Sequence, residues 1–504
     1  MKSFGVEGEG EMLKGVFLPY ISTSHVLPFV DIARIFTMHG GVDATIMTTP
    51  AHAATFQSCS TIRTHVVKFP QVPGLPEGMD TENINSVAAT CEETTSKVKE
   101  ALAILEGRFR QALHDMRPDF IVSDMFYPWT ADVAAKLGIP RVVYVGGTYL
   151  AQCAMDSLQR FVPHAKADSD GESFLLPGLP HKLEMTRAQI PDSFKEENEF
   201  TLLWKKVKES EKKSFGTLHM SFYALEGAYE EHYKAVTGIK SWSVGPVMSW
   251  VNQDAAEKAG RGYAKEERGG RKWKKEGWLT WLDSKNEDSV VYLCFGSMGK
   301  FNTAQLVEIA HALEDSGHDF LWVVKKIENN DDDEGGRSFL WEFEKRIQAS
   351  SKGYIIWGWA PQVLILEHPA IGAVVTHCGM NSIIESVDAG LPMVTWPLYA
   401  EQFFNEKLLV DVVKIGVPVG AKKWRSYGEF GDEIVKRDDI GKAIALLMGG
   451  GEESVEIRKR VKALSDAANK AIQVGGSSHN NLKDMIQELR SFKLQKVLLN
   501  NKRS

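Results

Sequence analysis

The chain has 504 residues, of which 25% are charged, and its formal net charge of −7 argues against nucleic acid or an anionic membrane as partner. This length fits roughly two to four domains, and 43% apolar residues are enough for large packed cores. Five scattered cysteines without a Cys-x-x-Cys pair, no apolar run of about 18 residues and no secretory signal favour a reduced, cytoplasmic protein without a transmembrane segment.

The first half of the chain alternates strand and helix patterns. Apolar runs predict strands at 13–20 and 42–49, and the segment between them, VLPFVDIARIF, has apolar residues at helical spacing. An amphipathic helix over 97–116 precedes a predicted strand at 119–124, and another strand follows at 141–146. Strands that alternate with helices indicate βαβ units and a parallel sheet.

A polar, charge-dense segment interrupts this pattern at residues 251–277. We interpret it as a linker or loop rather than a binding site, because such glycine-containing charge runs are usually solvated. A second series then begins with a strand at 289–297 and a helix at 302–317, and the runs DFLWVVK, GYIIWGW and GAVVTH predict further strands.

The repeated pattern predicts an α/β protein with two doubly wound, Rossmann-like halves, at 1–250 and 278–480. Sheets of this kind bind ligands at the carboxyl ends of their strands. We therefore expect the binding site in the cleft between the two halves.

One short segment, VVTHCGMNSIIESVDAG, concentrates polar side chains where a strand meets a helix. His377 follows the strand, Gly379 permits a tight turn, and Asn381 and Ser382 stand where the helix begins. The free N–H groups and positive dipole of a helix N-terminus suit a phosphate, and Glu385, one turn further on, can accept hydrogen bonds from a ribose diol. A nucleotide diphosphate site is one interpretation, and an N-capped helix beside a core histidine is the other; these residues alone do not separate them.

The surrounding sequence resembles the signature box of plant UDP-sugar-dependent glycosyltransferases. The stretch from Trp359 to Gln402 has the 44-residue length of that box, and STSH, VSDMFYPW, LPGLP, FGS and GGSSHNN follow in family order. Within the family, the chain is most similar to the branch that acts on triterpenoid saponins, such as the soyasapogenol glycosyltransferases. The resemblance implies a GT-B fold, with the acceptor in the first half, the UDP-sugar in the second, and a last helix, 481–504, that packs back toward the first half.

The resemblance also implies a donor site. Uracil is expected to stack on Trp359, the ribose to bind Glu385, and the sugar to bind Glu401 and Gln402. One position departs from the family pattern, because Met380 stands where the family usually has Trp, and an aromatic wall beside the sugar is lost. The residues expected at the UDP-sugar are Ser297, Trp359, Ala360, Gln362, His377, Gly379, Met380, Asn381, Ser382, Glu385, Glu401 and Gln402.

The resemblance places the catalytic base at His25, just after the first strand. An acceptor hydroxyl is a poor nucleophile until its proton is removed, and an imidazole titrates near working pH. Asp124, at the end of the strand 119–124, is the expected orienting partner. We expect no metal or other cofactor, and we interpret the Asp-rich DDDE at 331–334 as a solvated loop.

Aromatic residues in the first half are candidates for the acceptor site. Their number suits a large apolar acceptor without identifying it. The candidate walls are Phe126, Tyr127, Trp129, Tyr149, Phe200 and Trp204.

The predicted function is that of a monomeric, inverting, metal-independent glycosyltransferase that modifies a hydroxyl of a plant small molecule, a triterpenoid or its glycoside. Gln402 favours UDP-glucose, because Gln at this place generally accompanies glucose in the family. UDP-galactose, UDP-xylose, UDP-arabinose, UDP-rhamnose and flavonoid or phenolic acceptors are alternatives. A weakly catalytic sugar-nucleotide binder, suggested by Met380, and a nicotinamide-dependent oxidoreductase compete with this prediction, but the latter lacks a glycine-rich fingerprint.

Overall fold

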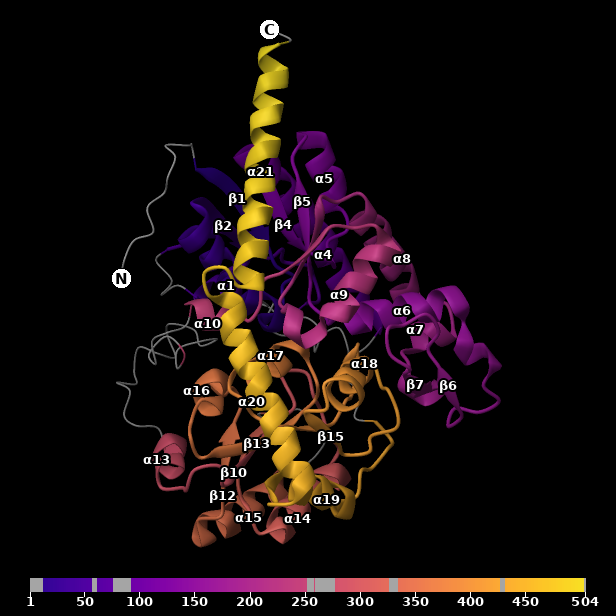
Figure 1. Ribbon diagram of the computed structural model, residues 1–504, viewed down its shortest axis with the longest axis vertical. Coiled ribbons are helices and arrows are strands. Elements are labelled where there is room, and N and C mark those ends of the chain that lie inside the picture. The colour runs from indigo at the N-terminus through magenta and orange to yellow at the C-terminus, as the bar shows by residue number, and fades with distance from the viewer. Residues whose placement is uncertain are drawn as a thin grey trace.

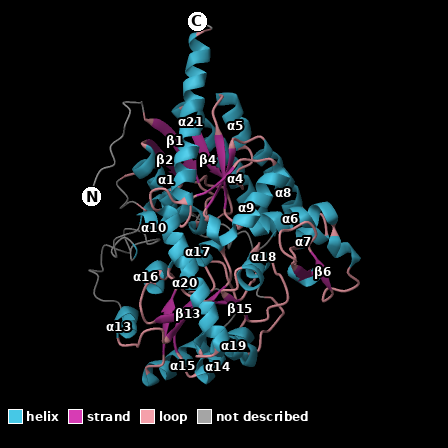
Figure 2. Ribbon diagram, viewed as in Figure 1, coloured by secondary structure: helices cyan, strands magenta, loops and turns pink. Residues whose placement is uncertain are grey.

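The computed structural model describes residues 12–56, 61–75, 92–251, 258, 277–325, 334–426 and 431–502. Most of the expected linker 251–277, the Asp-rich residues 331–333, Cys59 and Cys91 lie outside this part. Figures 1 and 2 show two α/β halves, one above the other, each with strands at its centre and helices around them. None of the described helices is both long enough and apolar enough to span a membrane.

The first half is built on a parallel sheet, in which the described strands have the order β3-β2-β1-β4-β5-β8-β9. Nearly continuous apolar runs such as FIVSD are buried along their whole length, as expected of strands covered on both faces. The strands are β1 (Leu13–Leu18), β2 (Val42–Thr48), β3 (Arg63–Val66), β4 (Phe120–Asp124), β5 (Arg141–Val145), β8 (Gly216–His219) and β9 (Ser241–Ser243).

Alternate residues of these strands face different helices. Phe17 packs in a cluster with α1 (Thr23–Gly40) and the C-terminal helix α21 (Ser477–Asn501). Its neighbours Val16 and Leu18 pack with α4 (Glu92–Met116) and α5 (Thr130–Leu137). The sheet is therefore covered on both sides, as in a doubly wound fold. The helices of this half are α1 (Thr23–Gly40), α2 (Pro50–Ala54), α4 (Glu92–Met116), α5 (Thr130–Leu137), α6 (Tyr149–Phe161), α7 (Asp192–Lys195), α8 (Glu199–Lys212), α9 (Tyr223–Thr237) and α10 (Val247–Val251).

The second half repeats the architecture, with described strands in the order β12-β11-β10-β13-β14-β15. Its helix α14 shows how the sequence sets the boundaries: the Asn302 side chain accepts a hydrogen bond from the Gln305 N–H, and Gly317 ends the helix in the left-handed conformation. The strands are β10 (Val290–Cys294), β11 (Asp319–Val324), β12 (Gly353–Trp357), β13 (Ile371–Thr376), β14 (Met393–Thr395) and β15 (Gly416–Pro418). The helices are α13 (Gly277–Asp283), α14 (Thr303–Ser316), α15 (Glu334–Ser350), α16 (Gln362–Leu366), α17 (Met380–Asp388), α18 (Gln402–Lys407), α19 (Arg437–Met448), α20 (Glu452–Ile472) and α21 (Ser477–Asn501), with a π-helix at Leu408–Val412.

The region between β5 and β9 contains elements that the sequence patterns did not predict. The helices α6, α8 and α9 lie there, together with a two-stranded antiparallel hairpin of β6 (Ser173–Leu175) and β7 (Glu184–Thr186). The same hydrophobic cluster includes side chains of α6, α8 and α9 and of the second half. This region therefore packs between the two sheets as well as on the first one.

The last helix, α21, lies against the first half although it follows α20 of the second half (Figure 1). Its Leu482, Met485, Ile486 and Leu489 are buried with α1 and the first sheet. Polar contacts add to this packing, because Arg490 Nη2 donates to the Gly40 carbonyl at 2.7 Å. The chain thus crosses back and ties the two halves together.

Truncating the fully buried Met485 tests this anchoring role. Met485→Ala should lower the free energy of unfolding by about 2–5 kcal/mol, because it leaves a cavity between α21 and the first sheet. Urea unfolding followed by tryptophan fluorescence measures the loss. The neighbouring Gln487→Ala, on the exposed face of the same helix, is the control. If both variants unfolded at the same urea concentration as the unchanged protein, α21 would not stabilise the first half.

Candidate active site

His25 and Asp124 meet at the carboxyl ends of two adjacent strands. His25 lies in the first turn of α1, directly after β1, and Asp124 ends β4. Because β1 and β4 pair in parallel, their ends lie side by side, and His25 Nδ1 is 2.7 Å from Asp124 Oδ2. The structure therefore brings together the two residues that were expected to form the catalytic pair.

The surroundings of this pair favour a basic imidazole. Burial alone would lower the pKa of His25, but the charge and hydrogen bond of Asp124, together with the charge of Glu401, outweigh it and raise the pKa. The Asp124 side chain is buried, and its Oδ1 accepts the Phe126 N–H at 3.0 Å. An ionised Asp124 accepts the proton on His25 Nδ1, which leaves Nε2 as the nitrogen that can take a proton.

A cavity of about 960 Å³ borders His25 in the first half. Its walls include Phe126, Tyr127, Trp129 and Phe200, four of the six aromatic residues expected at the acceptor site. The cavity is large enough for a bulky apolar molecule with one end beside the histidine.

The other two expected wall residues belong to the core. Tyr149 is fully buried, and its ring stacks on His219 with 3.8 Å between centroids. Trp204 is 5% exposed and stacks behind Phe200. Neither lines the cavity, so we correct the expected acceptor wall: Tyr149 packs against His219 of β8, and Trp204 packs against Phe200.

Tyr20 is a cavity residue that the sequence patterns did not single out. Its ring makes an edge contact with His25, with 5.7 Å between centroids, and also contacts Phe126. Burial and the charge of Asp124 raise the pKa of Tyr20 to about 12, so the phenol stays neutral. Its place two residues before the polar segment STSH (22–25) gave no signal, because a tyrosine at a strand end is common in a core.

In the second half, the ring of His377 lies against two glycines, where any larger residue would clash with it. His377 follows β13, and a Cβ on Gly296 or on Gly379 would lie 2.7 or 2.6 Å from its Nε2. Burial lowers the pKa of His377 to about 4, so the ring is neutral, and its buried Nδ1 has no hydrogen-bond partner among the described residues. A neutral imidazole here can donate one hydrogen bond to an anion.

The N-terminus of α17 adjoins this histidine. The helix begins at Met380 with Gly379 at its N-cap, so the first N–H groups of the helix are free of intrahelical partners. Backbone N–H groups in this position, with the helix dipole, favour a bound phosphate. The Met380 side chain itself is buried in the core at 4% exposure, so it contributes its backbone rather than a wall.

Further along, the residues expected at the nucleoside form a hydrogen-bonded group. Gln362 Nε2 donates to Ser382 Oγ at 3.0 Å and to Glu385 Oε2 at 2.6 Å, and its Oε1 accepts from Tyr292 at 3.3 Å. The remaining members of the expected set lie on loops around this group, with Ser297 exposed after β10, Trp359 37% exposed and Ala360 buried.

Gln402 differs from its expected role. Its side chain is 3% exposed, and its Oε1 accepts the N–H groups of Leu398 and Tyr399 at 2.9 and 3.0 Å. Since this carbonyl oxygen already has two backbone partners, the contact with the sugar that is expected of Gln402 can come only from its Nε2 amide.

Side chains from the two halves meet beside His25. Asn381 Nδ2 donates to the Ser24 carbonyl at 2.9 Å, and Asn405 Oδ1 accepts from Thr148 Oγ1 at 2.8 Å while its Nδ2 donates to the Cys378 carbonyl. Thr148 and Asn405 were not singled out from the sequence, because nothing local indicates a contact between residues so far apart in the chain.

Glu401 lies in the same place. It interacts electrostatically with His25, and burial raises the pKa of its carboxyl while Asn405 and His25 act in the opposite direction. A Cβ on Gly147 of the first half would lie 3.4 Å from its Cγ. The histidine, the acidic side chain and the α17 region therefore lie close together where the two halves meet. Within the described residues, no group of three or more His, Cys, Asp or Glu could hold a metal ion.

This arrangement can perform a defined chemistry. A histidine hydrogen-bonded to a carboxylate borders a large, partly aromatic cavity, and the N-terminus of α17 from the other half lies near it. Such a geometry suits removal of a proton from an acceptor and departure of a phosphate group on the opposite side.

Comparisons with known proteins show which family the chain belongs to. A family model described as UDP-glucoronosyl and UDP-glucosyl transferase matches residues 271–419. The chain is 57% identical over 493 residues to the Glycine max soyasapogenol B glucuronide galactosyltransferase, covering 96% of this chain and 97% of that protein. It is 43% identical to the Fragaria ananassa UDP-glucose flavonoid 3-O-glucosyltransferase 7, covering 94% and 95% of the two chains.

A solved structure has the same fold throughout. The crystal structure of Glycyrrhiza uralensis UGT73P12 complexed with glycyrrhetinic acid 3-O-monoglucuronide has a TM-score of 0.90 at 61% identity, covering 97% of this chain and 98% of that one. The two facing Rossmann-like halves therefore form a GT-B fold, as expected. With high identity over nearly its whole length, the chain belongs to the plant UDP-glycosyltransferase family and is a glycosyltransferase.

Proposed function

We propose that this enzyme transfers a hexose from a UDP-sugar to a hydroxyl of a triterpenoid glycoside, with a triterpenoid glucuronide as the acceptor class. The observation that carries the proposal is the His25–Asp124 pair at the border of the 960 Å³ cavity. The Glycine max relative is named for a soyasapogenol glucuronide, and the Glycyrrhiza structure holds a triterpenoid glucuronide, which supports this acceptor class.

In the proposed mechanism, His25 Nε2 takes the proton of the acceptor hydroxyl. The acceptor oxygen then forms a bond to the anomeric carbon, the bond from that carbon to the β-phosphate oxygen breaks on the opposite face, and the electron pair leaves with UDP. The configuration at the anomeric carbon is thereby inverted, and no metal takes part. Asp124 stabilises the imidazolium, and the helix N-terminus of α17 and the neutral His377 stabilise the diphosphate.

The donor is proposed to be a hexose, for which two observations favour different epimers. Gln402, at the end of the family box, favours glucose, whereas the relative with 57% identity is a galactosyltransferase. Glucose and galactose differ only at C4, so a hydroxyl without a partner in a closed site distinguishes them by about 1–3 kcal/mol.

Competition between donors tests the function itself. Equal concentrations of UDP-glucose, UDP-galactose, UDP-xylose, UDP-arabinose and UDP-rhamnose are offered with triterpenoid glucuronides and flavonoids, and products are read by mass and by chromatography against epimer standards. We expect a triterpenoid glucuronide to gain a hexose, with UDP-glucose preferred by at least about tenfold. A preference for UDP-galactose would overturn the argument from Gln402, and modification of the flavonoids alone would overturn the acceptor class.

Removing the base should stop transfer without removing donor binding. His25→Ala should lower kcat by at least about 100-fold, because general-base catalysis contributes that much, while the Kd for UDP stays unchanged. Kinetics and calorimetric UDP titration give the two values. A near-normal kcat in His25→Ala would refute the mechanism.

The pH dependence carries a further prediction. The base must be neutral, so kcat/KM falls as pH drops through the raised pKa of His25. Asp124→Asn removes the charge that raises this pKa, and the acid limb should move to lower pH while kcat falls at least about tenfold. Rates between pH 5 and 9 measure both effects, and an acid limb that stayed in place would contradict the role of Asp124.

The glycine beside His377 offers a matched test of the donor site. Gly296 and Gly317 have the same φ of +71°, but only a Cβ on Gly296 meets His377, whereas nothing lies within 4 Å of one on Gly317. Gly296→Ala should therefore raise the Kd for UDP by at least about tenfold, and Gly317→Ala should leave it unchanged although it carries a similar backbone cost. Equal Kd values for the two variants would exclude His377 from the donor site.

A further inference from the structure

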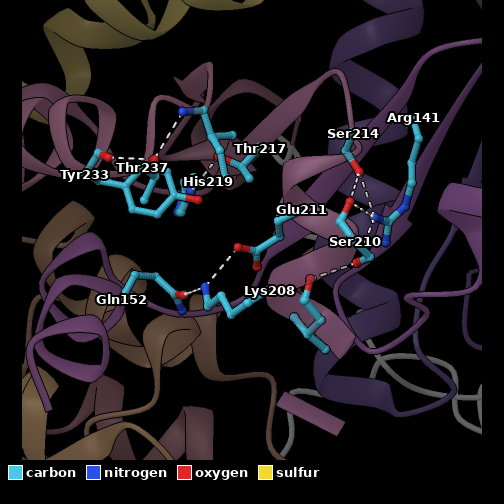
Figure 3. Close-up of polar contacts among 12 residues, drawn as sticks. Arg141, Gln152, Lys208, Ser210, Glu211, Ser214, Thr217, His219, Tyr233 and Thr237 are labelled. Carbon is cyan, nitrogen blue, oxygen red and sulfur yellow. Dashed lines mark hydrogen bonds and ion pairs between the residues drawn. The ribbon is translucent and has the colours of Figure 1, made fainter. Parts of the chain in front are cut away.

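A buried arginine lies behind the wall of the acceptor cavity. Arg141 is the first residue of β5 and is 2% exposed. Figure 3 shows its guanidinium turned toward Ser210 of α8 and Ser214 just beyond that helix. A buried cation is costly unless it is fully hydrogen-bonded, so its partners indicate what it holds in place.

Each nitrogen of the guanidinium contacts a different segment. Nε donates to Ser123 Oγ at 2.9 Å, Nη1 to Ser214 Oγ at 2.8 Å and to Ser210 Oγ at 3.2 Å, and Nη2 to the Tyr127 carbonyl at 3.2 Å. One planar group thus joins β4, the loop after it and α8. A lysine, with a single charged nitrogen, cannot reproduce this fork.

Two of these segments belong to the site: β4 ends in Asp124 of the catalytic pair, and the loop after it forms part of the cavity wall. Ser123 directly precedes Asp124, and Ser123 Oγ lies 2.7 Å from Thr130 Oγ1, which itself donates to the Tyr127 carbonyl. The loop 124–130 therefore has its start, middle and end fixed around Arg141. This loop carries Phe126, Tyr127 and Trp129 of the cavity wall, and Ser210 of α8 lines the same cavity from the other side.

The arginine also supplies a fixed positive charge that interacts with Asp124, the partner of His25. Burial lowers the pKa of Arg141 to about 10, while the charges of Glu211, Asp124 and Asp132 act in the opposite direction, so the side chain stays protonated at neutral pH. Glu211, from α8, has its own cation, because Lys208 Nζ donates to it at 2.9 Å and to Gln152 at 2.5 Å (Figure 3). Asp124 is the acidic group that Arg141 shares with His25.

We propose that Arg141 is a positioning residue for the transfer reaction: it fixes the loop 124–130 against α8 as the acceptor wall, and its charge sets the protonation of the His25–Asp124 pair. The inference rests on the proposed function for its kinetic part only. Arg141 contacts no reacting atom and acts through Asp124 and Tyr127.

The direction of the charge effect follows from the groups around the pair. Asp124 and Glu401 face His25, and Asp124, Asp132 and Glu211 face Arg141. Removing the arginine takes away the cation that interacts with Asp124, and the imidazolium of His25 becomes more stable. The pKa of His25 should therefore rise, and the acid limb of kcat/KM should move to higher pH.

Two variants separate charge from geometry. Arg141→Met removes both, whereas Arg141→Lys keeps the charge and loses the fork. In Arg141→Met the pKa of His25 should rise by about half a unit or more, and the acceptor KM should rise about fivefold or more because the wall is no longer fixed. In Arg141→Lys the acceptor KM should rise similarly while the pKa of His25 stays near its original value. The Kd for UDP should not change in either variant.

The control is Arg458→Met in the second half. Arg458 also donates to buried carbonyl groups, those of Gly372 and Leu447 at 2.9 and 3.0 Å, but it lies apart from the cavity. The Arg458→Met substitution should lower the stability of the protein without changing the acceptor KM or the pKa of His25. If Arg141 had only a structural role, Arg141→Met would behave like Arg458→Met: stability would fall, and the acceptor KM and the pKa of His25 would not change. That result would overturn the proposal.

The pKa is measured directly in the full-length chain by NMR of histidine labelled with ¹³C at Cε1. The signal of His25 is the one among the 14 histidines that disappears in His25→Ala. This measurement needs no turnover, so it tests the charge effect even if the unchanged enzyme modified none of the acceptors and the proposed function failed. If Arg141→Met did not fold, an unchanged acceptor KM in Arg141→Lys would overturn the proposal, and a raised one would support it.

Discussion

The site depends on one constraint, the parallel pairing of β1 and β4. Only neighbouring parallel strands bring two carboxyl ends to the same place, and this pairing puts His25 within 2.7 Å of a buried carboxylate that lies 99 residues away in the chain. Every other feature of the first half builds on that point: the loop after Asp124 forms the cavity wall, and Arg141, which begins the next strand, holds the loop from behind. The pairing of His25 with Asp124 therefore follows from the topology of the sheet.

The second half uses the same geometry for a different purpose. The turn after β13 places a neutral histidine and a helix N-terminus at a strand end, where an anion can bind, whereas the turn after β1 places a histidine that a carboxylate keeps basic. Two imidazoles on similar strand ends thus acquire pKa values shifted in opposite directions. The difference arises from their partners, because His25 has Asp124 and Glu401, while burial is the cause that acts on His377.

Contacts between the halves hold the His25 region and the His377 region next to each other. Asn381 binds the backbone of Ser24, next to His25, and Asn405 joins Thr148 to Cys378, next to His377. The C-terminal helix adds a second tie far from the cleft, with Met485 in the core of the first half. In the proposed mechanism, these links set the distance between His25 and the donor site, on which an in-line displacement depends.

The sequence by itself determined the strand–helix alternation, the family, and most residues at the strand ends, including His25, Asp124 and the segment from His377 to Glu385, because periodicity and turn chemistry are local properties. It did not predict α6, α8, α9 or the β6–β7 hairpin, whose apolar faces pack on both halves at once. Only the tertiary structure decided that Tyr149 and Trp204 belong to the core, that the Gln402 carbonyl is occupied, and that Tyr20, Thr148, Asn405 and Arg141 support the site. The physical reason is that burial and hydrogen-bond partners are set by residues distant in the chain, which no local pattern records.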